Sequence, residues 1–349
     1  MTDSKFLIGD RPVGEGAPCF IIAEVGLAHD GSLGAAHAYI DAAADAGADA
    51  VKFQTHIASA ESSTKEEFRV KVFPQDITRF EYWERTAFTE KQWRDLKQHA
   101  EEKQLVFLST PFSNAAVALL RRIGIKAWKI GSGETNNLLM LEEIASQVEP
   151  VLLSSGMSFI EELDRSIDLL RSNGSPVMVM QCTSSYPCPP ERYGLNMLGE
   201  YRRRFGIPVG FSDHSGEIAP GLAAVTMGAK AVEVHVTWSK QCFGPDVKAS
   251  LTFEQLAELV KGIRLLERSL ENDIDKDTLA QEMREMRQLF TKGLVASKTI
   301  VAGTLLERHH LDARKPCIGI PVSDYPSVLG RFVKRSLSMG EPIVWEDLE

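Results

Sequence analysis

The sequence predicts an α/β protein whose main domain is a (β/α)8 TIM barrel and whose C-terminal part forms a second, smaller domain. Three observations predict this fold. Short β-branched runs alternate with longer stretches of helical spacing. Eight such pairs fit into roughly 250 residues, which is the usual length of a TIM barrel. The alternation then stops near residue 270.

An open, doubly wound sheet is the alternative that the same alternation allows. Two features favour the barrel. No G-x-G-x-x-G motif follows the first run, and polar residues recur at the end of every run. A doubly wound sheet would gather such residues at one switch point.

Each predicted element follows from its local pattern. The eight predicted strands are residues 19–26, 50–55, 105–111, 127–134, 150–156, 176–184, 207–215 and 231–237. The clearest predicted helices are residues 32–48, 88–103, 114–124, 140–148, 159–174 and 251–270. A long, charged insertion that bears aromatic residues, 56–88, follows the second strand, and long loops on this face of a barrel are usually lids or contact arms.

The predicted domains follow the change in pattern. The barrel covers residues 1–270, a linker with a helix covers 271–293, and the small domain covers 294–349. This last part has short β-rich pieces, Pro and Gly turns and little helical spacing.

Composition limits the classes of function. The 349 residues carry a formal net charge of −9, which argues against a general binder of nucleic acid or of anionic membranes. No apolar run approaches the roughly 18 residues of a membrane span, and the first residues lack a signal-peptide pattern, so we expect a cytoplasmic protein. The 5 cysteines form no C-x-x-C pair, and we expect them to be reduced.

Polar side chains stand at the end of every predicted strand, and a barrel brings such ends together on one rim. In chain order they are Glu24 with His29, Lys52 and Gln54, Ser109 and Thr110, Lys129 with Ser132 and Glu134, Ser154 and Ser155, Thr183 with Tyr186, Ser212 with His214, and Glu233 with His235. Two lysines and several hydroxyls beside Gly-containing turns predict a pocket for a compact oxyanion such as phosphate or carboxylate.

His214 and His235 end consecutive strands and are candidate ligands of one divalent ion, with Glu24 as a further oxygen ligand or a water-mediated partner. Two histidines are a weak metal signal, and each is equally compatible with a structural role. Lys52 alone is compatible with a Schiff-base lysine, but Lys129 two strands away favours the clamping of an anion.

Two carboxylates have structural alternatives. Glu134 in the turn GETNN is also a candidate N-cap of the next helix. Asp246, which follows a Gly-Pro turn after the eighth strand, either reaches over the barrel mouth or forms an Asx turn.

The chain resembles the sialic acid synthase (N-acetylneuraminate synthase) family, which includes legionaminate and pseudaminate synthases. The stretches that carry the resemblance are IIAEVGLAHDGSL, AGADAVKFQT, FLSTPFS, KIGSGE, LSSGM, QCTSSYPCPPE, GFSDHS and GPDVKASL. The C-terminal stretch AGTLLERHHLDARKP resembles the antifreeze-protein-like domain that this family appends to its barrel.

The resemblance implies condensation of phosphoenolpyruvate (PEP) with an open-chain N-acetylhexosamine, either N-acetylmannosamine or a 2,4-diacetamido hexose, to a nonulosonic acid and phosphate. The implied catalytic residues are Glu24, Lys52, Lys129, His214 and His235. The implied PEP-binding residues are Lys52, Thr110, Lys129, Ser132, Ser154 and Ser212. The implied sugar-binding residues are Gln54, Glu134, Tyr186, Asp246 and Arg314.

The resemblance also implies that His214 and His235 hold a divalent metal, Mn2+ with Mg2+ or Co2+ as alternatives. It implies a domain-swapped homodimer in which the small domain of one subunit reaches over the barrel of its partner.

Three departures from the family pattern leave the acceptor sugar open. Lys315 follows Arg314, so either residue is a candidate for the sugar contact. Val247 replaces a usual His, and Ser184 replaces an Asn whose amide a hydroxyl does not reproduce.

Three other functions remain as alternatives. The first is a metal-dependent barrel aldolase or isomerase acting on another sugar or sugar phosphate. The second is a synthase of a non-amino deoxy-ketoacid. The third is a carbohydrate-binding or ice-binding module carried on an inert barrel.

Overall fold

Eight parallel strands form the sheet of the first unit of the chain, in the order β5-β4-β3-β10-β9-β8-β7-β6. Their bounds are β3 (Phe20–Gly26), β4 (Ala50–Thr55), β5 (Val106–Pro111), β6 (Trp128–Ile130), β7 (Val151–Ser154), β8 (Val177–Cys182), β9 (Val209–Asp213) and β10 (Ala231–Thr237). β5 and β6, the two ends of this order, lie against each other. The sheet is therefore a nearly closed barrel, as predicted.

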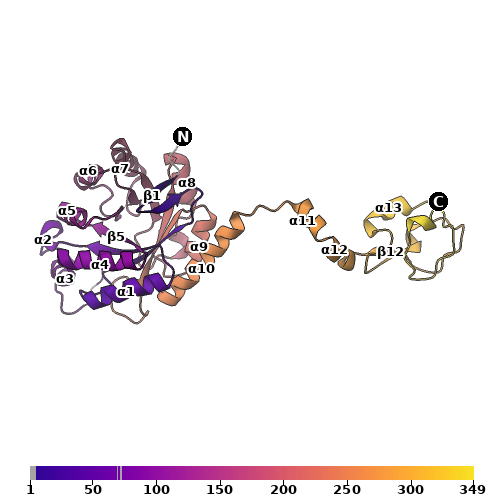
Figure 1. The fold of residues 1–349 in the computed structure, drawn as a ribbon, viewed down its shortest axis with the longest axis horizontal. Helices are drawn as coiled ribbons and strands as arrows, with labels where there is room; N and C mark the ends of the chain where they lie inside the picture. Colours follow the sequence, from indigo (N-terminus) through magenta and orange to yellow (C-terminus); the bar gives the residue numbers. More distant parts are fainter. Residues whose placement is uncertain (1–4, 69, 71–72) are drawn as a thin grey trace. The chain divides into compact units, whose positions relative to one another are not determined.

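The computed structural model describes residues 5–68, 70 and 73–349. The chain consists of two compact units, Met1–Glu271 and Asn272–Glu349 (Figure 1). Among the described residues, no helix combines the length and the apolar character needed to cross a membrane.

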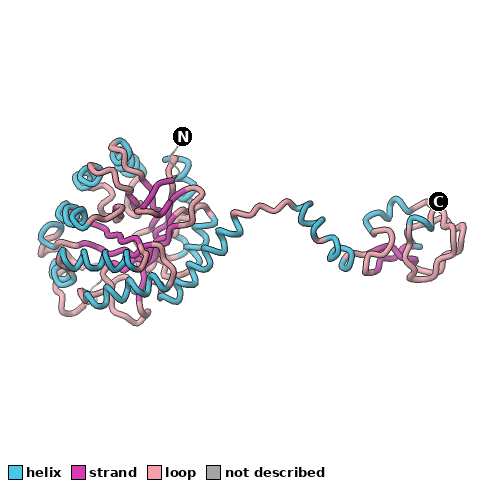
Figure 2. The backbone as a smooth tube through the Cα atoms, in the orientation of Figure 1, coloured by secondary structure: helices cyan, strands magenta, loops and turns pink. Residues whose placement is uncertain are grey.

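A helix follows each barrel strand, and Figure 2 shows these helices around the outside of the sheet. They are α1 (Leu33–Asp45), α4 (Glu90–Glu102), α5 (Asn114–Ile123), α6 (Leu138–Ala145), α7 (Ile160–Ser172), α8 (Asn196–Phe205), α9 (Ala219–Thr226) and α10 (Phe253–Leu270). Capping boxes at Thr89 and Thr252 start α4 and α10 because each threonine accepts a hydrogen bond from an otherwise unpaired backbone N–H. Gly124 ends α5 in the left-handed conformation, with φ of 75°.

Four strands, β6, β7, β8 and β9, end earlier than the sequence predicts. β6 stops at Ile130 because the chain turns there, with the Glu134 amide donating to the Gly131 carbonyl at 2.9 Å. β9 stops at Asp213, so His214 lies just beyond the strand. These shorter strands leave the polar residues at the same end of the barrel.

The interior of the barrel is divided into an apolar part and a polar part by the period of two along each strand. Phe20 and Ile22 of β3 lie in an apolar cluster, and Glu24 is the next residue on the same face. The barrel residues of this cluster are Phe20, Ile22, Ala50, Val106, Leu108, Ala127, Leu152, Met178, Met180 and Ala231. Polar side chains therefore occupy inward positions only toward the carboxyl ends of the strands.

An antiparallel hairpin, β1 (Lys5–Ile8) and β2 (Arg11–Gly14), packs against the amino-terminal end of the barrel. Its buried residues Phe6, Ile8 and Val13 belong to the interior apolar cluster. The sequence analysis assigned no element to this segment. The hairpin covers the end of the barrel opposite to the polar residues.

The insertion after β4 contains two short helices, α2 (Ala58–Glu61) and α3 (Arg79–Thr86). Arg85 links the insertion to the barrel, because its guanidinium donates to Asp30, in the loop after β3, at 2.7 Å. It also donates to Asp76 within the insertion at 2.7 Å. A small buried cluster within the insertion consists of Ala58, Phe73, Tyr82 and Trp83. Residues 69, 71 and 72 of this insertion lie outside the described residues.

The second unit holds α11 (Lys276–Glu282) and α12 (Arg284–Phe290), followed by a domain with few regular elements. In that domain β12 (Gly293–Ala296) pairs with β13 (Leu311–Arg314), and α13 (Tyr325–Val328) is a single short helix. Its core is small and apolar, formed by Leu294, Ala296, Ile300, Leu306, Leu311, Ile320, Val328, Val333, Leu337, Ile343 and Leu348. The predicted linker 271–293 contains both α11 and α12.

Candidate active site

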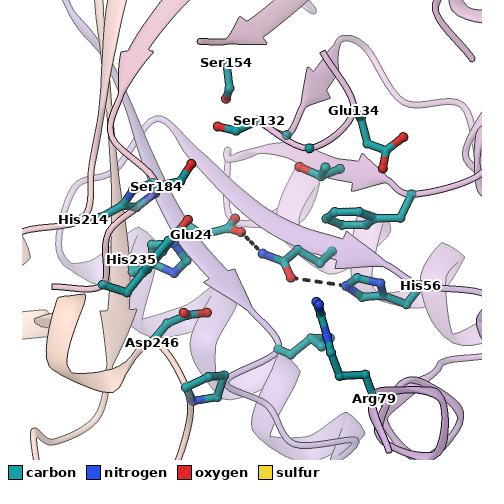
Figure 3. Close-up of a pocket in the computed structure, with 18 of the residues that line it drawn as sticks. Glu24, His56, Arg79, Ser132, Glu134, Ser154, Ser184, His214, His235 and Asp246 are labelled. Carbon is teal, nitrogen blue, oxygen red and sulfur yellow. Dashed lines mark hydrogen bonds between the residues drawn. The ribbon is translucent and has the colours of Figure 1, made fainter. Parts of the chain in front are cut away.

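A cavity of about 470 Å³ lies at the carboxyl ends of the barrel strands (Figure 3). Every site residue that the sequence predicts within the barrel lines it: Glu24, Lys52, Gln54, Thr110, Lys129, Ser132, Glu134, Ser154, Tyr186, Ser212, His214, His235 and Asp246. Arg314 is on β13 in the second unit, where it is exposed. The sugar contact assigned to Arg314 therefore stays a prediction.

Two lysines and two glutamates form a buried charge cluster at the centre of the rim. Lys52 Nζ lies 2.7 Å from Glu24 Oε2 and 3.8 Å from Glu233 Oε1. Lys129 Nζ lies 3.4 Å from the same Glu233 oxygen. Strand register produces this arrangement, because Glu24 is paired with Lys52 in the β3–β4 ladder. All four side chains are nearly inaccessible to solvent.

Electrostatic attraction between the opposite charges of this cluster keeps Lys52 and Glu233 charged. Burial alone would raise the pKa of Glu233, but Lys129 and Lys52 lower it to about 2. Burial works against the Lys52 ammonium, but Glu233 and Glu24 outweigh it and raise its pKa. Burial raises the pKa of Glu24 against the opposing effect of Lys52. Glu24 is thus the carboxylate of the cluster that takes up a proton most readily.

Hydroxyl groups surround the two ammonium groups. Lys52 donates to Thr110 Oγ1 at 3.1 Å, and Lys129 donates to Ser154 Oγ at 2.6 Å. Ser212 Oγ donates to Glu233 Oε1 at 2.9 Å. Such a set of cations and rotatable hydroxyls matches the oxygens of a phosphate or a carboxylate.

The small-residue turn after β7 leaves space beside these hydroxyls. A Cβ atom on Gly156 would lie 2.5 Å from Ser132 Oγ and 2.6 Å from both Cys182 Sγ and Ser184 Oγ. Ser132 Oγ and Cys182 Sγ are themselves 3.1 Å apart. Only glycine fits here without displacing three polar side chains that line the cavity.

His214 and His235 lie side by side at another part of the cavity, with ring centroids 5.4 Å apart (Figure 3). Tyr186 stacks on His214 at 4.1 Å. Burial and the neighbouring His235 lower the pKa of His214 to about 3, so its ring is neutral near pH 7. The Thr183 carbonyl accepts a hydrogen bond from His214 Nδ1 at 2.9 Å, which leaves the Nε2 lone pair available.

The two imidazoles fit part of a metal-ligand set. A neutral ring whose Nδ1 is bonded to a carbonyl presents Nε2 in the state that metals bind. Among the described residues, however, no group of three or more His, Cys, Asp or Glu side chains is arranged to hold a metal ion. The oxygens of Glu24 are engaged by Lys52 and by Gln54, whose Nε2 donates at 3.0 Å. A bound ion would therefore need water or substrate oxygens to complete its ligands.

The structure decides against both structural alternatives for the carboxylates. Asn137, not Glu134, caps α6, and it also donates to Glu134 Oε2 at 2.7 Å. Burial raises the pKa of Glu134. Asp246 precedes a short 3-10 turn, Val247–Ala249, and makes no side-chain capping bond to it. Both carboxylates line the cavity.

Several residues of the cavity are not predicted from the sequence as site residues. Glu233 was noted only as a strand-end residue, although its position two before His235 places it on the same inward face. His56, Glu61 and Arg79 come from the insertion, where no strand or helix period indicated which side chains turn inward.

The fold and the cavity together define a class of protein. A TIM barrel with buried lysines, hydroxyls and paired imidazoles at the carboxyl ends of its strands is an enzyme built to hold an anionic substrate beside a second group.

Comparison with known proteins identifies the family. The NeuB family model matches residues 39–275, and the SAF domain model matches residues 291–349. The chain therefore belongs to the NeuB family and is a PEP-dependent transferase of the sialic acid synthase type. The SAF match agrees with the predicted antifreeze-like domain.

Similar proteins cover nearly the whole chain. The N-acetylneuraminate-9-phosphate synthase of Homo sapiens is 35% identical over 347 residues, with 96% of this chain and 94% of that protein covered. The N,N'-diacetyllegionaminic acid synthase of Campylobacter jejuni is 34% identical over 329 residues, with 93% and 98% covered. The crystal structure of the N-acetylneuraminic acid synthetase of Leptospira borgpetersenii has a TM-score of 0.72 at 30% identity and covers 82% of this chain and 97% of that one.

Proposed function

We propose that this enzyme condenses PEP with an open-chain N-acetylhexosamine, N-acetylmannosamine or a 2,4-diacetamido hexose, to a nonulosonic acid and inorganic phosphate. The observation that carries the proposal is that one cavity is lined both by the buried Lys52 and Lys129 and by the His214 and His235 pair. Family membership supports the PEP half of the reaction.

The anion-binding part of the site suits PEP. Its phosphate and carboxylate would be held by Lys52, Lys129, Thr110, Ser132, Ser154 and Ser212, all of which line the cavity. Glu24 and Glu233 balance the two ammonium charges in the free enzyme. PEP would replace these contacts in part, so that the enol is held in one orientation for attack.

The chemical steps are a carbon–carbon bond formation and the loss of phosphate. The C3 carbon of PEP attacks the aldehyde carbon of the sugar, water adds at C2, and the bond from C2 to the phosphate oxygen breaks. Glu24 would orient the water or move its proton, a role that suits a carboxylate whose pKa burial raises.

His214 and His235 would hold a divalent metal, Mn2+ with Mg2+ or Co2+ as alternatives. NeuB-family synthases are generally metal-dependent. When bound, the metal would supply a Lewis acid for the aldehyde oxygen. His214 would contribute a neutral nitrogen donor, because its ring is held in place by the Thr183 carbonyl and by Tyr186.

The acceptor sugar would contact Gln54, Glu134, Tyr186 and Asp246, and Arg314 would come from the partner subunit of a domain-swapped homodimer. Ser184, which lines the cavity, and Lys315, which follows Arg314, leave the choice of hexose open. A cytoplasmic location is part of the same proposal.

A phosphate-release assay tests the proposal. The purified enzyme is given PEP with mannosamine-type, 2,4-diacetamido and plain hexose acceptors, each with and without a chelator. We expect acceptor-dependent phosphate release with an N-acetylated acceptor. An aldolase or isomerase would release none, and release with the plain hexose alone would indicate a non-amino ketoacid synthase.

Two variants test whether the activity depends on residues of the cavity. Lys52→Ala and His235→Ala should each lose turnover while circular dichroism shows a folded barrel. Normal steady-state rates in both variants would contradict the proposal and would favour a binding role of the small domain.

A further inference from the structure

His56, in the first turn of the insertion, is held flat between two aromatic rings. Its ring centroid lies 3.8 Å from that of Trp83 at an interplanar angle of 2°, and 4.2 Å from that of Phe112 at 13°. Arg79 lies 4.7 Å from the Trp83 ring centroid and adds a cation to the stack. His56 is 7% exposed. The two stacking contacts therefore fix the plane of the His56 ring.

Both ring nitrogens of His56 have polar partners in that plane. Nδ1 lies 2.6 Å from Glu61 Oε1, and Nε2 lies 3.3 Å from Gln54 Oε1. The second oxygen of Glu61 accepts from the Ile57 amide at 3.2 Å, so the carboxylate is also fixed. His56 thus joins the insertion to β4.

The direction of the Gln54 amide follows from these contacts. Gln54 Nε2 donates to Glu24 Oε1 at 3.0 Å, so its Oε1 turns toward His56 (Figure 3). An amide oxygen can only accept, so the contact with Gln54 requires a hydrogen on His56 Nε2. Without the donor on His56, the Gln54 amide would keep its hydrogen bond to Glu24, but its oxygen would lose the hydrogen bond that fixes it.

We propose that His56 is a positioning residue that fixes the Gln54 amide for binding of the acceptor sugar. The inference rests on the proposed function, and it adds a residue of the insertion to the residues that the sequence predicts for the site. Gln54 lines the cavity between Glu24 and His56, so a fixed amide presents a defined set of donors and acceptors to sugar hydroxyls. His56 and Glu61 would thereby couple the insertion to acceptor recognition.

Two substitutions at this position separate hydrogen bonding from packing. His56→Phe keeps a ring between Trp83 and Phe112 but removes both polar contacts. His56→Gln removes the ring but places an amide N–H where Nε2 donates. His29→Phe is the matched control, because His29 is also buried and stacks on Phe88 at 4.6 Å but does not line the cavity.

The measurement is steady-state phosphate release with the acceptor and PEP varied in turn. We expect His56→Phe to raise KM for the acceptor about tenfold, the loss that one or two hydrogen bonds represent, with KM for PEP unchanged. His56→Gln should recover part of the loss, and His29→Phe should match the wild type. A double variant, His56→Phe with Glu61→Gln, should remain as impaired as His56→Phe alone.

Three results would overturn the role of His56. These are wild-type acceptor KM in His56→Phe, a larger defect in His56→Gln than in His56→Phe, and full recovery in the double variant, which would trace the defect to an unpaired Glu61 carboxylate. A wild-type enzyme that releases no phosphate with any acceptor would instead overturn the proposed function, and the role of His56 with it.

Discussion

The Glu233 carboxylate lies 3.4 Å from the Lys129 ammonium inside the barrel, and both side chains are almost completely buried. The same oxygen accepts from Ser212 and faces Lys52 at 3.8 Å. Glu233 Oε2 has no hydrogen-bond partner within the described part of the chain. The Glu233 carboxylate thus supplies much of the negative charge that balances Lys52 and Lys129.

Glu233→Gln should lower the free energy of unfolding at neutral pH by about 3 kcal/mol, because two buried ammonium groups would then share the single carboxylate of Glu24. Urea denaturation of the purified variant measures this difference. Glu258→Gln, on the exposed face of α10, is the control and should change stability by less than about 0.5 kcal/mol. Equal stability of the two variants would contradict the assigned charge balance.

Gly156→Ala should weaken PEP binding, because the added methyl group displaces Ser132, Cys182 and Ser184 from the cavity wall. We expect KM for PEP to rise at least about tenfold, as expected when one or more anion contacts are lost. Gly133→Ala is the matched control, since its Cβ would meet only the Met157 methyl group at 3.8 Å. Similar PEP constants in both variants would place the anion elsewhere.

Removal of divalent metal should abolish phosphate release, and addition of Mn2+, Mg2+ or Co2+ should restore it. The ion that restores the highest rate identifies the preferred metal. His235→Asn should weaken Mn2+ binding in calorimetry by at least about tenfold, since even changes outside the direct ligands have effects of this size. Full activity after exhaustive chelation would rule out the metal role of the histidine pair.

Mixing of two inactive variants tests the domain-swapped homodimer. Lys52→Ala disables the barrel site, and Arg314→Ala removes the side chain that we assign to the partner subunit. If Arg314 acts across the dimer, a mixed dimer contains one intact site, and subunit exchange should restore part of the activity. Absence of recovery, with exchange verified by mass, would show that Arg314 acts within its own chain, and an active Arg314→Ala variant would show that it has no role at the site.

We expect the buried phenol of Tyr39, on α1, to lower the free energy of unfolding at high pH. Burial raises the pKa of its phenol to about 12, from a value near 10 in the unfolded chain. The folded pKa is the higher one, so the contribution of Tyr39 is complete below pH 10 and is lost as the pH rises toward 12. The stability difference between wild type and Tyr39→Phe should therefore shrink across this window in urea denaturation, and a constant difference would contradict the assignment.

The barrel was predictable because short β-branched runs and stretches of helical spacing can each be recognised from neighbouring residues in the sequence. Polar residues such as Lys52 and His235 were found for the same reason: they interrupt an apolar run at its carboxyl end. Glu233 occurs in the same kind of run, but nothing in the sequence indicated that two lysines from other strands would meet its carboxylate.

Contacts made by irregular segments were not predictable. His56 and Glu61 belong to an insertion without a period, and their relation to Gln54 depends on how that segment packs against Trp83 and Phe112. The hairpin at residues 5–14 has strands of four residues each, too short for its alternation to distinguish it from a loop.

The division of the barrel interior into an apolar lower part and a polar upper part has an evolutionary consequence. Each strand contributes residues to both parts through alternate positions, and the hairpin seals the lower part. Substitutions near the mouth can therefore adapt the enzyme to a new acceptor while the sealed base continues to guide folding. Laboratory selection for new sugar preferences should draw its accepted mutations from the mouth and from the insertion above it, and few from the base.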